Sequence, residues 1–269
     1  MKAPLLILGA ALCGVTLLSV AQQAAPPAPA WYTMTFLKAP GDKTAAYEEA
    51  VRTQLAKVAE SRVNSGELTF WAHNRLLLPG GSDAKYSHVL VYRYAGIPNL
   101  DLPPEETAAR WAKAGVKRSD YVDRMNGLGV AVVKRELWRG LDGAGSVEAG
   151  DFIRLDMKKV SNNAQYSDLE RTVYKPYWEE RIKIGAMKAW GLYTLSIPGG
   201  EDRPYGFLTM QGFKDEQQML GPAGVTARDS WAKTAPGQDP YAINKRAAEV
   251  SHTTATELWR VIQVARAAR

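Results

Sequence analysis

A repeat within the sequence constrains the fold of this chain more than any other feature. LPGGSDAKY at 78–86 returns in altered form as IPGGEDRPY at 197–205, and each segment follows a tryptophan, Trp71 or Trp190, at the same interval. Glycine supplies the positive φ angles that a tight loop between two strands requires. The repeated segment therefore predicts the same hairpin twice. No helix is expected directly after the glycines, so the segment is weak evidence for a phosphate-binding loop.

The repeat continues through the rest of each half. Trp-Ala-Lys at 111–113 returns at 231–233, and Glu-Leu-Trp-Arg at 136–139 returns at 257–260, so the offset grows only from 119 to 121 residues. A register kept over about 100 residues indicates a tandem duplication. The inferred parts are a first copy at 31–140, a glycine-rich linker at 141–150, a second copy at 151–263 and a basic tail at 264–269.

Each copy shows the pattern of a β-α-β-β-α-β unit, the ferredoxin-like order. Apolar residues at three- and four-residue spacing over 44–62 predict an amphipathic helix with Thr44 as its N-cap. Gly66 and Gly185 are expected to end the first helix of each copy, and Pro176 to kink the helix of the second. Strands are expected at 31–38, 68–78, 86–94, 151–160, 187–197 and 205–213, with a last strand ending at each Glu-Leu-Trp-Arg.

A ferredoxin-like sheet carries helices on one face only, so its other face must be covered. Two tandem copies can cover each other, sheet against sheet, which predicts an α+β protein whose two ferredoxin-like (βαββαβ) domains form one internal pseudo-dimeric α/β barrel. On this element order, the helix-Gly-x₄-Trp runs and the Pro-Gly-Gly hairpins, the chain resembles the dimeric α/β-barrel superfamily. Within it, the chain looks like secreted bacterial proteins of unknown function related to NIPSNAP and stress-responsive barrel domains.

The resemblance implies a pocket that holds a small apolar or aromatic molecule. Some members of the superfamily bind haem, and some oxidise quinol-like substrates without a cofactor. Fold alone does not transfer an activity, and no catalytic motif of the superfamily matches this sequence residue by residue. The catalytic residues and any cofactor therefore stay unknown at this point.

The first 30 residues have the pattern of an export signal. Lys2 precedes an apolar run from Leu5 to Val20, and Ser19-Val20-Ala21 fits a cleavage site, so 1–21 are predicted to be a signal peptide and 22–30 a Pro/Ala linker. The apolar run has about 16 residues, fewer than the roughly 20 that span a bilayer. The protein is expected to be secreted or periplasmic, with no membrane span in the mature chain.

The remaining composition indicates an ordinary folded domain with a solvated surface. Cys13, the single cysteine, falls within the predicted leader, so the mature chain is expected to hold no disulfide. Eight tryptophans can supply a substantial core, and the net charge of +6 comes from basic residues interspersed with acidic ones. This pattern does not call for a lipid or nucleic-acid partner, and it leaves a homodimer open.

Two histidines of the first copy are candidates for chemistry. His73 and His88 fall on neighbouring strands of one hairpin and can approach each other, while their counterparts in the second copy are Leu192 and Phe207. Such a pair can act as a general base or as a haem ligand, or remain hydrogen-bonded in a half-buried sheet. No metal site is predicted, because a third ligand of suitable type is missing from this stretch.

Aromatic residues on the strands either line an apolar pocket or pack in the core. The candidate ligand-binding residues, histidines included, are Trp71, His73, Tyr86, His88, Tyr92, Trp190 and Tyr205. RPYGFLTM at 203–210 also matches part of the RNA-recognition signature. Export, and the burial of the required sheet face by the second copy, argue against a nucleic-acid partner.

Two adjacent glutamate pairs and the two Glu-Leu-Trp-Arg segments are the remaining charged motifs. Carboxylates adjacent on a helix point about 100° apart, so Glu48-Glu49 and Glu179-Glu180 are interpreted as solvated faces rather than acid–base pairs. The two Glu-Leu-Trp-Arg segments are expected to hold structural ion pairs, Glu136 with Arg139 and Glu257 with Arg260.

Three functions remain open from the sequence. The favoured one is binding of a small apolar or aromatic molecule in a barrel pocket, near Trp71, His73, Tyr86 and His88. The second is an oxygenase-like or haem-dependent enzyme that uses the same pocket, with His73 or His88 as base or haem ligand. The third is a structural or protein-interaction module without a pocket.

Overall fold

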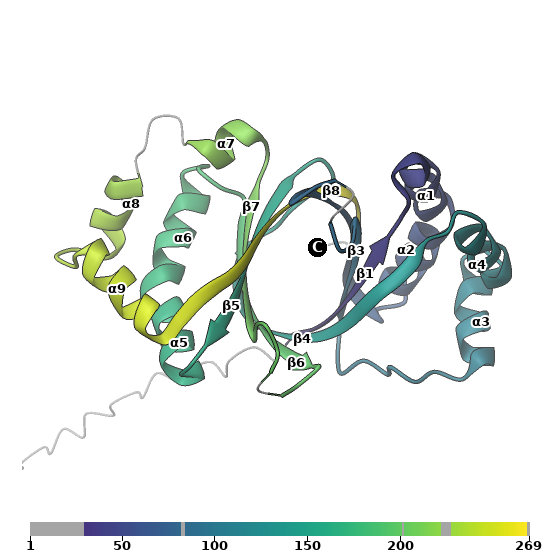
Figure 1. Cartoon of the computed structure of the whole chain (residues 1–269), viewed down its shortest axis with the longest axis horizontal. Coiled ribbons are helices and arrows are strands. Elements are labelled where there is room, and N and C mark those ends of the chain that lie inside the picture. Colours follow the sequence, from purple (N-terminus) through teal and green to yellow (C-terminus); the bar gives the residue numbers. More distant parts are fainter. Residues whose placement is uncertain (1–29, 82–83, 201, 222–226, 268–269) are drawn as a thin grey trace, which may run out of the picture.

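The structure, a computed structural model, describes residues 30–81, 84–200, 202–221 and 227–267. The predicted signal peptide and all of the Pro/Ala linker except Ala30 lie outside these residues. Eight strands form one closed barrel, and the helices cover it on two opposite sides (Figure 1). Within the described ranges, no helix is long and apolar enough to cross a membrane.

The two halves of the chain follow the same order of elements. The first comprises β1 (Ala30–Lys38), α1 (Thr44–Ala50), α2 (Ala56–Asn64), β2 (Leu68–Leu78), β3 (His88–Tyr94), α3 (Pro104–Lys113), α4 (Arg118–Gly127) and β4 (Ala131–Gly145). The second comprises β5 (Phe152–Val160), α5 (Asn163–Leu169), α6 (Lys175–Lys183), β6 (Ala189–Ile197), β7 (Phe207–Phe213), α7 (Glu216–Leu220), α8 (Ala227–Thr234), α9 (Pro240–Val250) and β8 (Ser251–Arg266).

The barrel is closed by two long strands that each belong to both halves. The strands follow the order β1-β3-β2-β8-β5-β7-β6-β4, and β4 returns to β1. β4 pairs with β1 over 131–140 and with β6 of the other half over 137–145. β8 likewise pairs with β5 over 251–260 and with β2 over 258–266. The halves are thus joined edge to edge by backbone hydrogen bonds, which leaves the barrel without an open sheet edge.

This pairing revises three sequence expectations. Residues 141–145 of the predicted linker continue β4, and residues 264–266 of the predicted tail continue β8. The Glu-Leu-Trp-Arg segments lie in the middle of these strands and do not end them. The predicted hairpin strands at 68–78 and 187–197 do end at the Pro-Gly-Gly loops, as β2 and β6.

The first helix of each half contains a wider π-helical turn at an equivalent position. It spans Val51–Leu55 in the first half and Glu170–Tyr174 in the second. The expected irregularity near Pro176 exists, but the first half has the same turn without a proline, so proline is not required for it. Thr44 is the first residue of α1, and its hydroxyl donates to the Pro40 carbonyl instead of capping the helix. Gly66 and Gly185 end these helices with φ of 76° and 72°, as predicted.

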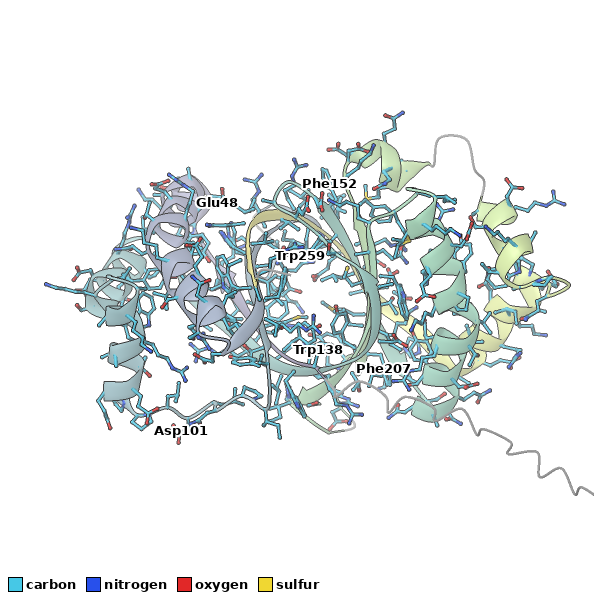
Figure 2. All side chains as sticks on the ribbon, turned by 180° about the vertical axis from the view of Figure 1, so that it is seen from behind. Glu48, Asp101, Trp138, Phe152, Phe207 and Trp259 are labelled. Carbon is cyan, nitrogen blue, oxygen red and sulfur yellow. The ribbon has the colours of Figure 1, made fainter. Side chains whose placement is uncertain are left out.

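Side chains alternate between the barrel interior and the helix-covered outer face, because successive residues of a strand point to opposite sides. The interior cluster includes Met34, Phe36, Trp138 and Trp259, and the two tryptophans lie on opposite sides of the barrel interior (Figure 2). Separate clusters fill the layers between the strands and the helices of each half. Whether a residue stands at an odd or an even position along its strand therefore decides whether it can contribute to a site inside the barrel.

Candidate functional site

A cavity of about 760 Å³ opens at one end of the barrel. Its apolar lining includes Tyr32, Phe70, Val147, Tyr193 and Met210, which come from both halves of the chain. The Tyr32 and Tyr193 rings meet edge to face, with their centroids 5.0 Å apart. The volume falls in the range of about 300–1,000 Å³ that is usual for small-molecule sites. We call this space the mouth cavity.

A second, smaller space lies deeper in the barrel. It has a volume of about 80 Å³ and shares those five apolar residues with the mouth cavity. Deeper side chains such as Phe36 and Trp259 complete its lining. Because a cavity that holds one benzene molecule measures about 150 Å³, this space takes at most a small apolar group. A ligand with an aromatic ring must therefore lie mainly in the mouth cavity.

Arginines dominate the charge around the mouth cavity. The guanidinium carbons of Arg93 and Arg266 lie 5.9 Å and 5.9 Å from the ring centroids of Tyr32 and Phe70. Arg139 and Arg171 also line the cavity. Asp142 is the one carboxylate among the described residues of the lining, and Lys175 and Arg171 pair with it at 2.9 Å and 3.9 Å.

The other end of the barrel interior contains two matching Tyr–Glu–Trp groups. In one, the Tyr205 hydroxyl donates to Glu136 Oε1 at 2.6 Å, and Trp138 Nε1 donates to Glu136 Oε2 at 3.1 Å. In the other, the Tyr86 hydroxyl donates to Glu257 Oε1, and Trp259 Nε1 donates to Glu257 Oε2 at 3.1 Å.

The two groups also match in their ring packing. Tyr205 stacks on Trp138 with centroids 6.0 Å apart, and Tyr86 stacks on Trp259 with centroids 5.9 Å apart. We call these the two triads, each made of a tyrosine, a glutamate and a tryptophan.

Lys134 lies beside the triads and forms an ion pair with the glutamate of one of them. Lys134 Nζ lies 2.9 Å from Glu136 Oε1, donates to the Tyr205 hydroxyl, and stands 4.1 Å from the Phe36 ring centroid. The equivalent position of the second half is Ala255, so Glu257 has no lysine of its own. Burial raises the pKa of Glu257 above its usual value, against the hydrogen bond from Tyr86 and the positive charge of Lys134. The triads therefore differ in their surroundings, since Lys134 pairs with Glu136 and alanine stands at the equivalent position of the second half.

His73 and His88 lie outside the barrel, between the strands and the helices of the first half. Both are fully buried, with ring centroids 5.2 Å apart, and both pack against Tyr47 of α1. His88 Nδ1 lies 2.9 Å from Ser87 Oγ, and Nε2 lies 3.2 Å from Glu48 Oε1.

Neither ring nitrogen of His73 has a hydrogen-bond partner among the described residues. Burial, together with the neighbouring His88, lowers the pKa of His73 to about 3. The rings are enclosed by packed side chains, so these histidines do not fit the axial position of a haem. We therefore derive no haem chemistry from them.

The structure places the seven candidate residues in different layers. Tyr86 and Tyr205 belong to the triads inside the barrel. Trp190 belongs to the buried layer of the second half, although it also borders the mouth cavity. Trp71, His73, His88 and Tyr92 lie in the layer under the helices of the first half. As ligand contacts these residues stay a prediction.

Sequence reasoning missed Lys134, Arg93 and Arg266, and it assigned other roles to Glu136 and Glu257. Alternation along β4 and β8 was the available signal, since Glu and Trp two positions apart share a face. The same alternation shows why the expected ion pairs were wrong. Residues three apart on a strand point to opposite faces, and Glu136 pairs with Lys134, not with Arg139.

The prediction that the adjacent helix glutamates are solvated was correct for only one residue of each pair. Glu49 and Glu179 are solvated, with side chains 43% and 51% exposed. Glu48 and Glu180 instead turn inward: Glu48 pairs with Arg75 at 3.2 Å, and Glu180 pairs with Lys233 at 2.6 Å. Adjacent helix positions differ by about 100°, so one of each pair faces the neighbouring elements. Figure 2 shows Glu48 on the helix side of the barrel. In the described part of the chain, no cluster of three or more His, Cys, Asp or Glu residues is arranged to hold a metal ion.

Comparison with solved structures places the chain among barrels of the same kind. A proposed monooxygenase from Lactobacillus acidophilus has a TM-score of 0.54 at 10% identity, over 88% of this chain and 96% of that chain. A proposed monooxygenase from Fusobacterium nucleatum has a TM-score of 0.52 at 7% identity, over 88% and 94%. A haem-binding protein from Thermus thermophilus has a TM-score of 0.47 at 8% identity, over 87% and 91%.

At these identities the similarity shows the fold alone, that of the dimeric α/β-barrel proteins, here built from one chain. No protein-family model matches the chain, and the comparison with curated proteins finds no match either. The function must therefore be argued from the site.

Proposed function

We propose that this protein binds a small molecule with an apolar or aromatic body in the mouth cavity of the barrel. The observation that carries the proposal is the cavity of about 760 Å³ with a floor of Tyr32, Phe70, Tyr193 and Met210. Aromatic and thioether side chains at the end of a closed barrel offer apolar surface that water covers poorly. The inner space of 80 Å³ admits only the tip of such a ligand.

A neutral fluorescent probe, N-phenyl-1-naphthylamine, tests the proposal. Its emission is expected to rise on binding to the purified mature protein. Met210→Trp fills the floor of the cavity, and Ala267→Trp places an indole at its exposed rim. Each is expected to weaken binding by about 10-fold or more, equivalent to about 1.4 kcal/mol.

Ala248→Trp, at an exposed position of α9, is the matched control and should leave the affinity unchanged. Native mass spectrometry of the protein as isolated would show any organic molecule that it already carries. If the probe does not bind, or if both rim and floor variants bind it as the wild type does, the mouth cavity is not a binding site.

The polar end of the barrel favours a second candidate, an enzyme that acts on the tip of a ligand that extends from the mouth cavity through the inner space, where Trp259, the partner of Glu257, forms part of the lining. Glu257 is a buried carboxylate whose pKa burial raises, which makes it a stronger base than an exposed carboxylate, and it lies beside the Tyr86 hydroxyl. An oxygenase-like reaction that begins by deprotonating a ligand hydroxyl would use such a group.

Oxygen uptake with a dihydroxynaphthalene tests this candidate. The wild type should exceed the uncatalysed rate, and Glu257→Gln should lose the excess while still binding the naphthylamine probe. Glu60→Gln, exposed on α2, is the control. A rate equal to the uncatalysed one would remove the enzyme from consideration.

Three further points belong to the proposal. The shared element order and the repeat support two tandem ferredoxin-like units of common origin. The helix-Gly-x₄-Trp runs and Pro-Gly-Gly hairpins support the relation to NIPSNAP and stress-responsive barrel proteins. The apolar run at 5–20 supports export to the periplasm or beyond, which N-terminal sequencing of the mature protein would test, and sedimentation would test whether two chains pair.

A further inference from the structure

The arginines of the mouth cavity form part of one row across the barrel wall. Four lumen-facing residues of adjacent strands lie opposite one another in register. Tyr32 of β1 pairs with Arg93 of β3, and Arg93 pairs with Phe70 of β2. Phe70 in turn pairs with Arg266 of β8. We call Tyr32, Arg93, Phe70 and Arg266 the arginine row.

This row brings two guanidinium groups to one aromatic floor. Neighbouring strands are about 4.8 Å apart, so Arg93 and Arg266, which flank Phe70, have backbones about 10 Å apart. Arginine side chains are long enough to converge on one group over that span. Each guanidinium already stands over a ring of the floor, Tyr32 for Arg93 and Phe70 for Arg266.

The positive charge of the row is not neutralised by carboxylates in the described residues. Arg266 donates to the Val147 carbonyl, a neutral group. Asp142 is held by Lys175 and Arg171. Arg93 and Arg266 therefore retain donors for an anion, and guanidinium binds carboxylates, sulfonates and phosphates through paired hydrogen bonds.

The second half of the chain carries a different row at the equivalent place. Its residues, in the same register, are Ile153, Gly212, Ala189 and Gly145. A Cβ atom on Gly145 would lie 2.0 Å from the Lys188 carbonyl oxygen, and one on Gly212 would lie 2.6 Å from Val147 Cγ1. The two glycines of this row have no room for larger side chains, so the second half cannot carry a matching pair of cations at the positions of Arg93 and Arg266.

We propose that the ligand of the mouth cavity is an organic anion: a flat apolar body with one acidic group that Arg93 and Arg266 hold. The body lies on the Tyr32, Phe70 and Tyr193 rings, and the acidic group faces the solvent side of the row. This inference rests on the proposed binding function and adds the charge class and the orientation of the ligand.

Two probes that share an aromatic body and differ in charge test the inference. They are 1-anilinonaphthalene-8-sulfonate, an anion, and neutral N-phenyl-1-naphthylamine. The wild type is expected to bind the sulfonate at least about 10-fold more tightly at low salt, and salt should weaken only the sulfonate. Arg93→Gln and Arg266→Gln should each raise the Kd of the sulfonate by about 10-fold and leave that of the neutral probe within about 2-fold.

Two controls keep the test specific. Arg246→Gln, exposed on α9, removes the same charge elsewhere and should change neither Kd. Arg93→Lys retains the charge without the paired donors and should give an intermediate Kd for the sulfonate. Thermal melting identifies any variant that fails to fold, and the measurement then rests on the other arginine.

The possible outcomes distinguish a failure of this inference from a failure of the proposed binding function. Equal affinity for the two probes, or equal weakening of both by Arg93→Gln, overturns the anionic ligand while binding in the cavity stands. Failure of both probes to bind, or binding that Met210→Trp and Ala267→Trp leave unchanged, overturns the binding function and the inference with it.

Discussion

Replacement of His73 by leucine should make the protein both more stable and less sensitive to acid. The imidazole is fully buried beside His88, and neither of its ring nitrogens has a partner in the described structure. An unpaired buried polar group costs about 1–3 kcal/mol. Leucine already occupies the equivalent position, Leu192, under the helices of the second half, where it is fully buried. We expect His73→Leu to raise the free energy of unfolding at pH 7.5 by about 1–3 kcal/mol.

The acid sensitivity follows from the lowered pKa of His73. The pKa is about 3 in the folded protein and 6.5 for an ordinary histidine. Protonation therefore favours the unfolded chain: the titration of His73 costs little stability above pH 6.5 and lowers the free energy of unfolding as the pH falls from 6.5 toward 3. Between pH 7.5 and pH 5, the unfolded chain takes up nearly one proton at this residue that the folded protein does not. The loss over that interval is about 2 kcal/mol.

Urea unfolding at pH 7.5 and pH 5 measures this difference directly. The other groups of the cluster, Glu48, Arg75 and His88, remain in the variant, so the change in slope belongs to His73. His252→Leu, at an exposed position of β8, is the control. If His73→Leu loses as much stability between the two pH values as the wild type does, then His73 is not a buried neutral imidazole. A variant less stable than the wild type at pH 7.5 would show that its nitrogens have partners.

Three further substitutions test the barrel interior and its closure. Glu136→Gln should lower the free energy of unfolding by about 2 kcal/mol, because Lys134 loses the carboxylate 2.9 Å from its ammonium. Glu257→Gln should lower it less, since burial already disfavours the charged form of Glu257, and equal losses in chemical denaturation would contradict the difference between the triads. Gly145→Ala should cost about 3 kcal/mol or more, because φ is +72° and the new Cβ would lie 2.0 Å from the Lys188 carbonyl oxygen. Gly41→Ala, with no atom within 4 Å of its Cβ, is the control, and similar melting temperatures for both would refute the close approach.

The sequence predicted the hairpins well because their information is local. Two strands, a Pro-Gly-Gly loop and a preceding helix that ends at glycine need no knowledge of the other half. The lengths of β4 and β8 were not predictable in this way. Gly143 and Gly145 resemble a linker, yet they lie in β4, where their lack of a side chain permits close approach to β6. Close approach between the halves is a long-range property that composition does not reveal.

The candidate site was less predictable than the fold, because a residue's odd or even position along its strand decides which face it occupies, and residue type does not reveal this. His73 and Ala72 are neighbours on β2, but Ala72 lines the barrel interior and His73 lies under the helices. A histidine suggests a catalytic or ligand-binding role from its residue type alone, whereas an arginine at a strand end is usually interpreted as a surface charge. Only the closed register shows that Arg93 and Arg266 flank the same phenylalanine.

The differences between the two halves indicate where the barrel has become specialised. The Tyr–Glu–Trp arrangement exists twice with nearly equal distances, and each time a tyrosine of one half binds the glutamate of the other. The residues that differ between the halves include three cations: Lys134, Arg93 and Arg266 stand where the other half has Ala255, Gly212 and Gly145. A core that only has to be filled gains nothing from a cation, because burying a charge costs free energy unless a partner compensates for it, and Arg93 is exposed at the open end and fills no core. Lys134 has Glu136 as that partner, whereas the two arginines at the open end face a cavity. The asymmetry therefore favours a ligand with a preferred direction, its charge at the open end and its apolar body toward the triads.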